Sequence, residues 1–218
     1  MKILIDSAVI DEVRAALDSG FVAGVTTNPT LLRRAGVRAA ELPELASQAI
    51  AAGAGELHLQ VYADDAAGML DEARALIALD PARVVVKIPA TLAGYRAAGQ
   101  LAAQGARITL TAVYTLRQAL LAQSVGARYV AIYLGRMRDA GVDALGLARE
   151  MQALLRAQSA GVDILAASIR DPQEIVALGH AGIGAATLPA PILQRLLESD
   201  ATAQAAAAFG ADARAIME

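Results

Sequence analysis

The sequence contains no cysteine and no tryptophan, and aromatic residues make up only 3% of its 218 residues. Without cysteine the chain can form no disulfide, iron–sulfur cluster or thiolate zinc site. Its two histidines, His58 and His180, are a poor metal site, because transition metals usually take roughly three or four protein ligands. We therefore expect an enzyme that uses no metal and no cofactor.

The chain also lacks an excess of positive charge. Its formal net charge is -3, its lysines and arginines are scattered, and it has few aromatic rings on which bases could stack. Nucleic acids and anionic membranes are therefore poor candidates for partners. Asp6 interrupts the first apolar run too early for a signal peptide. Glycines and prolines break the longest uncharged stretch, residues 175–194, so we expect no membrane span and a cytoplasmic protein.

Short β-branched apolar runs recur along the chain, and each is followed by an amphipathic stretch rich in alanine and leucine. The expected strands are residues 2–6, 22–28, 56–61, 83–89, 107–113, 129–134, 163–168 and 184–188. The expected helices are residues 8–17, 43–52, 66–79, 92–104, 116–125, 144–160, 172–181 and 191–198.

This alternation predicts an α/β fold of parallel strands joined by crossover helices. Eight such units favour closure into a (β/α)8 TIM barrel. An open doubly wound sheet is the alternative, but no glycine-rich dinucleotide motif or P-loop follows any strand. We expect residues 1–218 to form a single domain. Residues 201–218 would add a C-terminal helical extension that packs on its own barrel or on a neighbouring subunit.

Barrel active sites lie at the carboxyl ends of the strands. Seven successive expected strands carry one polar residue near that end: Asp6, Asn28, Gln60, Lys87, Thr111, Tyr133 and Ser168. The pattern predicts that these side chains converge on one pocket.

Lys87 interrupts an otherwise apolar strand, Val-Val-Val-Lys-Ile-Pro. Burial of an ammonium group is costly and favours loss of its proton. A neutral amine is the nucleophile that Schiff-base formation on a carbonyl requires. The alternative is a structural lysine that pairs with a carboxylate such as Asp6, or one that extends to the barrel mouth.

Asp6 could bind a substrate hydroxyl and transfer protons near this lysine, or it could cap the following helix, a role that Ser7 can also fill. Gln60, Thr111 and Tyr133 could hold a water that relays the proton removed from a substrate hydroxyl. Alternatively, these uncharged groups satisfy one another in a wet barrel core.

Arg136 and Arg170 follow the sixth and seventh expected strands, and Ser168 ends the seventh. Loops near the seventh strand commonly bind phosphate in barrels, and an arginine with a hydroxyl suits a phosphoryl dianion. Either arginine could instead be an ordinary surface residue. Thr26 and Asn28 lie at the end of the second strand, where the Asn-Pro step favours a turn.

Several segments together resemble the small transaldolases and fructose-6-phosphate aldolases, and the resemblance runs from Ile3 to about Phe209. The matching segments are Leu4-Ile5-Asp6-Ser7, Gly24-Val25-Thr26-Thr27-Asn28-Pro29, Val85-Val86-Lys87-Ile88-Pro89, Thr111-Ala112-Val113-Tyr114, Gly126-Ala127-Arg128-Tyr129-Val130 and Leu165-Ala166-Ala167-Ser168. The second and third segments together are highly specific, whereas either one alone would be only suggestive.

The resemblance implies a TIM barrel with a class I mechanism, in which Lys87 forms the Schiff base and Asp6 is the acid/base carboxylate. It also implies that Asn28 binds substrate hydroxyls and that Arg136 and Ser168 bind phosphate. The family often forms rings, so a homo-oligomer, either a pentamer or a decamer, is expected.

Gln60 and Tyr133 are similar to the residues of the aldolase branch, since transaldolases carry Glu and Phe there. Leu134-Gly135-Arg136 looks more like a transaldolase. The leading hypothesis is a class I aldolase that cleaves the C3–C4 bond of fructose 6-phosphate, with small ketones and aldehydes as further substrates. The alternatives are a transaldolase that passes a dihydroxyacetone unit between sugar phosphates and, more remotely, a non-catalytic sugar-phosphate binder.

Overall fold

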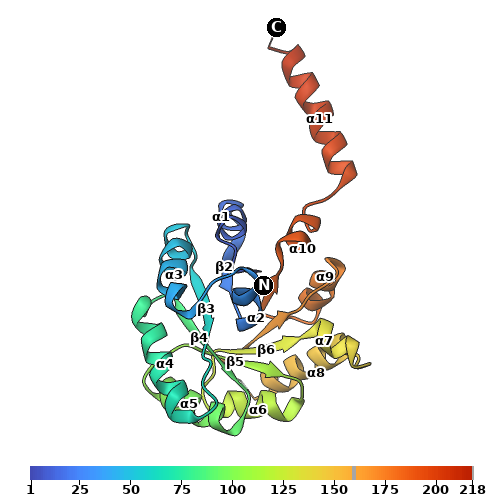
Figure 1. Cartoon of the computed structure of the whole chain (residues 1–218). Helices are drawn as coiled ribbons and strands as arrows, with labels where there is room; N and C mark the ends of the chain where they lie inside the picture. The colour runs from blue at the N-terminus through green and yellow to red at the C-terminus, as the bar shows by residue number, and fades with distance from the viewer. Residues whose placement is uncertain (159–160, 218) are drawn as a thin grey trace.

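The computed structural model describes residues 1–158 and 161–217 and contains a closed barrel of parallel strands surrounded by helices (Figure 1). Each strand pairs with the next along the chain, and the last pairs with the first. The predicted (β/α)8 TIM barrel is therefore confirmed, and the open sheet is wrong. The strands are β1 (Lys2–Asp6), β2 (Val22–Thr26), β3 (Glu56–Gln60), β4 (Val84–Pro89), β5 (Ile108–Val113), β6 (Tyr129–Tyr133), β7 (Asp163–Ala167) and β8 (Ala185–Leu188).

The helices that were expected lie within three residues of their predicted bounds, and residues 159, 160 and 218 of those predictions lie outside the described residues. They are α1 (Ile10–Asp18), α3 (Leu42–Ala51), α4 (Ala66–Leu79), α5 (Leu92–Ala103), α6 (Leu116–Ser124), α8 (Ala144–Ala157), α9 (Gln173–His180), α10 (Ala190–Arg195) and α11 (Asp200–Ala215).

Two short helices and one 3-10 turn were not expected: α2 (Pro29–Arg34), α7 (Leu134–Asp139) and η1 (Ala39–Glu41). The Asn-Pro step that predicted a turn is in fact the start of α2, because the Asn28 side-chain oxygen accepts the Leu31 N–H at 3.1 Å. Proline at the first helical position suits this cap. Likewise α7 begins directly after β6, so the expected sixth strand ends one residue earlier, at Tyr133.

The core divides into two parts because successive residues of a strand point to opposite faces. Val84, Val86 and Ile88 of β4 pack against the helices. Val85 packs inside the barrel, in a cluster that includes Leu4, Tyr129, Ala131, Leu165 and Ala185. Lys87 follows Val85 by two residues, so it too points into the barrel, closer to the carboxyl end of the strand.

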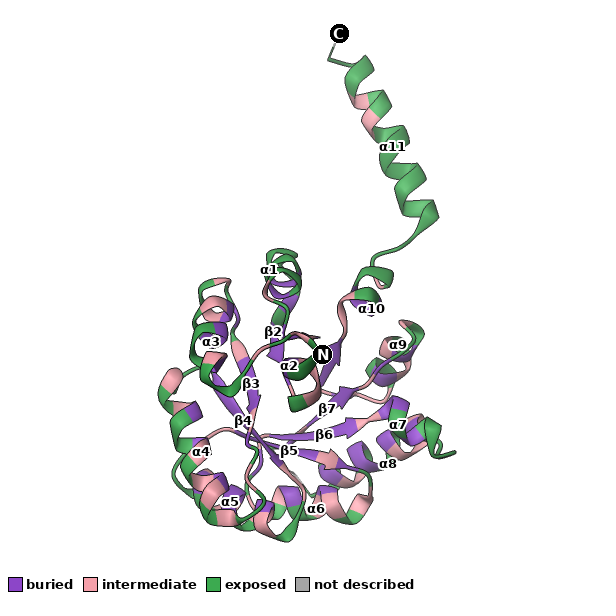
Figure 2. Ribbon diagram, viewed as in Figure 1, coloured by how far each residue is buried: buried purple, intermediate pink, exposed green. Residues whose placement is uncertain are grey.

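The C-terminal helix α11 extends away from the barrel (Figure 1), and Figure 2 shows it almost wholly exposed. Phe209 in this helix is 71% exposed, and the following Ile216 and Met217 are also exposed. A helical extension was expected here, but α11 does not pack on its own barrel. Over the residues that the structure describes, no helix is long and apolar enough to cross a membrane.

Candidate active site

The carboxyl end of the barrel brings most of the predicted site residues together. Residues in register on neighbouring parallel strands point to the same face of the sheet. Gln60 is in register with Lys87, and Asp6 is in register with Thr26. The side chains of these four residues therefore lie on the inside of the barrel, toward its carboxyl end.

Lys87 is the most deeply buried charged-type side chain at this end, with only 4% of its surface exposed. Its Nζ donates a hydrogen bond to the Thr27 carbonyl oxygen at 2.7 Å. Burial lowers the pKa of Lys87, the Asp6 carboxyl opposes this shift, and the Arg136 guanidinium adds to it. The environment thus favours the neutral amine, which is the form that attacks a carbonyl.

The pKa of Asp6 is shifted in the opposite direction to that of Lys87. Burial raises the pKa of its carboxyl, although Lys87 and a hydrogen bond from Thr26 act in the opposite direction. Thr26 Oγ1 donates to Asp6 Oδ1 at 2.7 Å, and Thr187 Oγ1 lies 2.7 Å from Thr26 Oγ1. A hydroxyl has one proton to donate, so Thr187 donates to Thr26 while Thr26 donates to the carboxylate. The result is a carboxyl held in place by a chain of two hydroxyls.

Thr187 was missed in the sequence, although it follows the same pattern as the predicted residues. It is a single polar residue within the apolar run of β8 and is 2% exposed. Its position near the end of the eighth strand was the sequence signal that could have identified Thr187.

Thr111 and Tyr133 come from neighbouring strands and share a hydrogen bond, with 2.6 Å between their hydroxyl oxygens. Burial raises the pKa of Tyr133, so its hydroxyl stays protonated and can donate. The Arg136 guanidinium lies over the Tyr133 ring, 4.7 Å from its centroid. Gln60, Lys87 and this pair thus occupy four consecutive strands, β3 to β6.

Ser168 directly follows β7, and Arg136 lies in the first turn of α7, which follows the adjacent strand β6. The Gly135 N–H donates to the Ser168 carbonyl oxygen at 3.0 Å. Only glycine fits at position 135, because a Cβ there would come within 2.6 Å of that oxygen and 2.7 Å of Ser168 Oγ. Ser168 itself has a φ of 58°, which is rare for a residue with a side chain. The close contact between the Gly135 and Ser168 backbones therefore keeps Arg136 near Ser168.

Arg170 is placed differently from the other predicted residues. Its side chain is exposed and forms a bidentate ion pair with Asp139 of α7, at 2.7 and 2.5 Å.

The Asn28 side chain lies at the barrel mouth, where its oxygen caps α2 and its amide group remains a hydrogen-bond donor.

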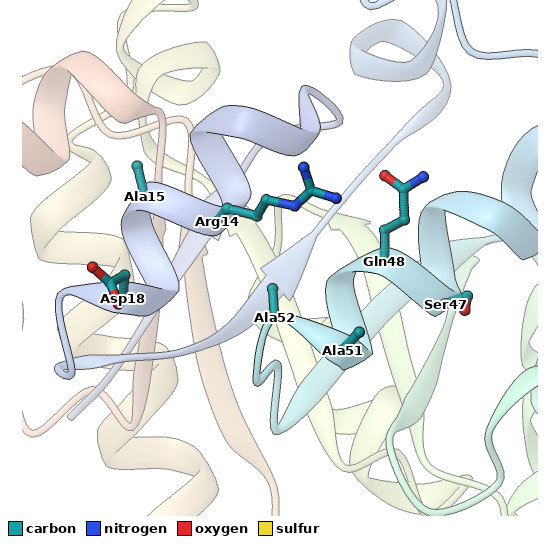
Figure 3. Close-up of a pocket in the computed structure, with 7 residues that line it drawn as sticks. All are labelled: Arg14, Ala15, Asp18, Ser47, Gln48, Ala51 and Ala52. Carbon is teal, nitrogen blue, oxygen red and sulfur yellow. The ribbon is translucent and has the colours of Figure 1, made fainter.

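Outside this site, two further points concern metal binding and a hollow on the surface. Among the described residues, no group of three or more His, Cys, Asp or Glu side chains could hold a metal ion. A surface hollow lies between α1 and α3, where Arg14 extends from one helix toward the other (Figure 3). This hollow lies on the outer helical layer and includes none of the residues at the strand ends.

A buried amine of lowered pKa, near a carboxyl of raised pKa at the carboxyl end of a (β/α)8 barrel, is the arrangement expected of an enzyme that forms a Schiff base with its substrate. The fold and the site thus define a class of enzymes, the class I aldolases. Comparison with known proteins identifies the family within that class.

The sequence profile of the family described as Transaldolase/Fructose-6-phosphate aldolase matches residues 3–218. A probable transaldolase from Heliobacterium modesticaldum is 37% identical over 202 residues, which cover 93% of this chain and 92% of the relative. A probable transaldolase from Dehalococcoides mccartyi is 33% identical over 219 residues, which cover 100% of both chains. The chain therefore belongs to the transaldolase/fructose-6-phosphate aldolase family.

Among solved structures, a mandelate oxidase superposes with a TM-score of 0.63 at 17% sequence identity. The match covers 88% of this chain and 66% of the oxidase chain, and it shows the shared barrel fold alone. Family membership makes the chain an enzyme of the class I aldolase type and implies sugar-phosphate substrates. The non-catalytic sugar-phosphate binder is thereby disfavoured.

Proposed function

We propose that this enzyme is an aldolase that cleaves fructose 6-phosphate into dihydroxyacetone and glyceraldehyde 3-phosphate through a Schiff base on Lys87. The single observation that carries the proposal is the buried amine of Lys87. It lies inside the barrel near its mouth, where burial lowers its pKa and Asp6 is close enough to oppose that shift.

In the proposed reaction, neutral Nζ of Lys87 attacks C2 of the ketose and forms a carbinolamine. Asp6 donates a proton to the departing hydroxyl, so that water leaves and an iminium remains. The C3–C4 bond then breaks, its electron pair moves into the iminium to give an enamine, and the C4 hydroxyl proton leaves to a base. Protonation of the enamine at C3 and hydrolysis release dihydroxyacetone and restore the amine.

The aldolase branch is supported by Gln60, which is in register with Lys87, and by the Thr111–Tyr133 pair on the next two strands. Gln60 cannot ionise, so it can orient a water but cannot accept a proton at neutral pH. Tyr133 supplies a titratable hydroxyl, which Thr111 fixes by the hydrogen bond at 2.6 Å. We propose that a water held by these three side chains relays the C4 hydroxyl proton.

For the rest of the substrate, we propose that Arg136 and Ser168 bind the phosphate and that Thr26 and Asn28 contact the sugar hydroxyls. Thr26 also holds Asp6 in place. Arg170 would assist phosphate binding from the rim, and only after its guanidinium leaves Asp139.

A transaldolase is the second candidate, because the relatives compared above are described as probable transaldolases. Such an enzyme would pass the dihydroxyacetone unit from Lys87 to an acceptor such as erythrose 4-phosphate. The two reactions share the Schiff base and differ in whether water or an aldose phosphate removes the three-carbon unit.

Borohydride reduction in the presence of fructose 6-phosphate tests the shared step. We expect a stable adduct on Lys87, located by peptide mass spectrometry, and an adduct at another residue would refute the mechanism. The branch is tested by comparing the rate of free dihydroxyacetone release with the rate of its transfer to erythrose 4-phosphate. Slow release with fast transfer would favour the transaldolase.

We also propose that the protein forms a homo-oligomer, a pentamer or a decamer. The exposed apolar side chains of α11 and the residues after it support this, because an isolated helix of this length gains stability only by packing. Light scattering should give a mass above that of the 22.4 kDa chain, and a monomer would refute it. The cytoplasm remains the proposed compartment, since phosphorylated sugars do not cross bilayers unaided.

A further inference from the structure

A buried carboxylate, Glu174, joins α7 to the loop between β7 and α9. Glu174 lies in the first turn of α9 and is 5% exposed. Its Oε1 lies 2.6 Å from Nη1 of Arg138 in α7, and its Oε2 lies 3.3 Å from Nη2 of the same arginine. The contact at Oε2 is a hydrogen bond and the contact at Oε1 is a close ion pair, and together they tie the first turn of α9 to α7.

The same carboxylate also holds the backbone of the loop. Its Oε2 accepts the N–H of Arg170 at 3.1 Å and the N–H of Asp171 at 3.3 Å. Burial of a carboxylate is costly, and an ion pair often does no more than offset that cost. What Glu174 adds is geometry, because one carboxylate fixes a helix on one side and a loop on the other.

Both partners of Glu174 lie two residues away from the proposed phosphate-binding groups. Arg138 follows Arg136 by two residues in the same short helix, and the Arg170 N–H follows Ser168 by two residues in the loop. Figure 1 shows α7 and α9 on the same side of the barrel. A shift of the loop relative to α7 would therefore change the separation of Arg136 and Ser168.

We propose that Glu174 is a positioning residue that sets the spacing between Arg136 and Ser168 for the phosphate group of the substrate. This inference rests on the proposed function, in which those two residues bind phosphate. Glu174 acts through Arg138 and the loop backbone, and it touches no reacting atom. Its effect should accordingly be confined to phosphorylated substrates.

The test is Glu174→Gln, which keeps the shape of the side chain and removes the charge that holds Arg138. Aldol addition is measured with dihydroxyacetone as donor and either glyceraldehyde 3-phosphate or unphosphorylated glyceraldehyde as acceptor. We expect KM for the phosphorylated acceptor to rise about tenfold while kcat changes less than about threefold, since small misplacements of a binding group are costly. We expect kcat/KM for glyceraldehyde to stay within about twofold.

Glu72→Gln is a matched control. Glu72 of α4 holds a different loop in the same way, since its Oε2 accepts the N–H groups of Tyr62 and Ala63 after β3. This variant makes the same chemical change far from the proposed phosphate groups. We expect its preference for the phosphorylated acceptor to equal that of the unmodified enzyme.

Arg138→Lys is the second variant, because Glu174→Gln could reduce folding. It keeps the positive charge but loses the planar two-point contact, and we expect a smaller change in the same direction. An equal loss with both acceptors, or an unchanged preference in both variants, would overturn the proposal. If the unmodified enzyme shows no preference for the phosphorylated acceptor, the phosphate site of the proposed function fails, and this inference fails with it.

Discussion

The two ends of the barrel carry the same pair of groups, a lysine and a carboxylate, in opposite states. At the amino end, Lys2 Nζ lies 2.8 Å from Glu56 Oε1, and Tyr129 donates to Glu56 Oε2 at 2.8 Å. The hydrogen bond to Glu56 raises the pKa of Lys2. Burial alone would raise the pKa of Glu56, but hydrogen bonds from Lys2 and Tyr129 and the nearby His58 ring, whose Nε2 lies 3.5 Å from Glu56 Oε2, outweigh it and hold that pKa well below its usual range. This pair is charged.

At the carboxyl end the shifts have the reverse sign, since the pKa of Lys87 is lowered and that of Asp6 is raised. The difference lies in the partners. Lys2 is 44% exposed and bonds directly to a carboxylate, whereas Lys87 is buried and donates to a backbone carbonyl. A carbonyl satisfies an amine hydrogen bond without supplying the charge that would stabilise an ammonium group. The fold thus pairs one lysine with a carboxylate and leaves the other, the proposed nucleophile, without one.

The largest expected effect separates the two lysines by activity. Lys87→Met removes the proposed nucleophile, so kcat/KM for fructose 6-phosphate cleavage should fall at least about 10³-fold. Borohydride trapping should be lost at the same time. Lys2→Met is the matched control at the other end of the barrel, and it should retain both activity and trapping. Turnover retained in Lys87→Met would show that Lys87 is not the nucleophile.

The next largest effect concerns the proton transfer proposed for Asp6. Asp6→Asn keeps the shape of the side chain but cannot transfer a proton, so kcat should fall about 10²–10³-fold. Trapping on Lys87 should become slower but should remain detectable, because the amine is still present. A kcat within a few-fold of the unmodified enzyme would show that Asp6 only supports the structure.

The barrel and the central part of the site followed from the sequence, because both depend on local patterns. Lys87 was placed in the pocket because it is a single charged residue near the carboxyl end of an otherwise apolar strand. The helix α4 was predicted to the residue, and in the structure the Asp65 side chain caps its start by accepting the Gly68 N–H at 2.9 Å. The short helix α2 was missed because its Asn-Pro step was assigned to a turn, and α7 was missed because it follows β6 with no residue between them to mark its start.

Other parts of the site depend on contacts between distant residues, which no local pattern records. Glu174 looks like an ordinary first-turn glutamate, and only the fold brings Arg138, 36 residues earlier, against it. In the same way Arg170 looked free to bind phosphate, whereas the fold places Asp139 beside it. The choice of an ion-pair partner is therefore the feature that the sequence alone could not provide.

A third effect concerns stability at the amino end. Because the folded-state pKa of Glu56 lies below its ordinary value of 4.5, its contribution is fully present above that pH and is lost as pH falls through the folded pKa. Glu56→Gln should therefore lower the free energy of unfolding by about 1–2 kcal/mol at pH 7. In urea unfolding experiments, the difference from the unmodified enzyme should shrink in strong acid. A difference that stays constant with pH would contradict the charged pair.

The smallest expected effect is on the free energy of unfolding of Lys87→Met, which should rise rather than fall. The folded-state pKa of Lys87 lies below its ordinary value of 10.5, so the unfolded chain binds a proton that the folded chain releases, and stability rises with pH across that interval. Lys87→Met removes this cost and should stabilise the fold by up to about 1 kcal/mol at neutral pH, with the gain shrinking as pH approaches 10.5. Lys2→Met should instead destabilise it slightly, by less than about 1 kcal/mol, because Lys2 is half exposed and its pKa is raised. Thermal unfolding of both variants across a pH series measures the two signs, and a loss of stability in both would show that Lys87 is charged like Lys2.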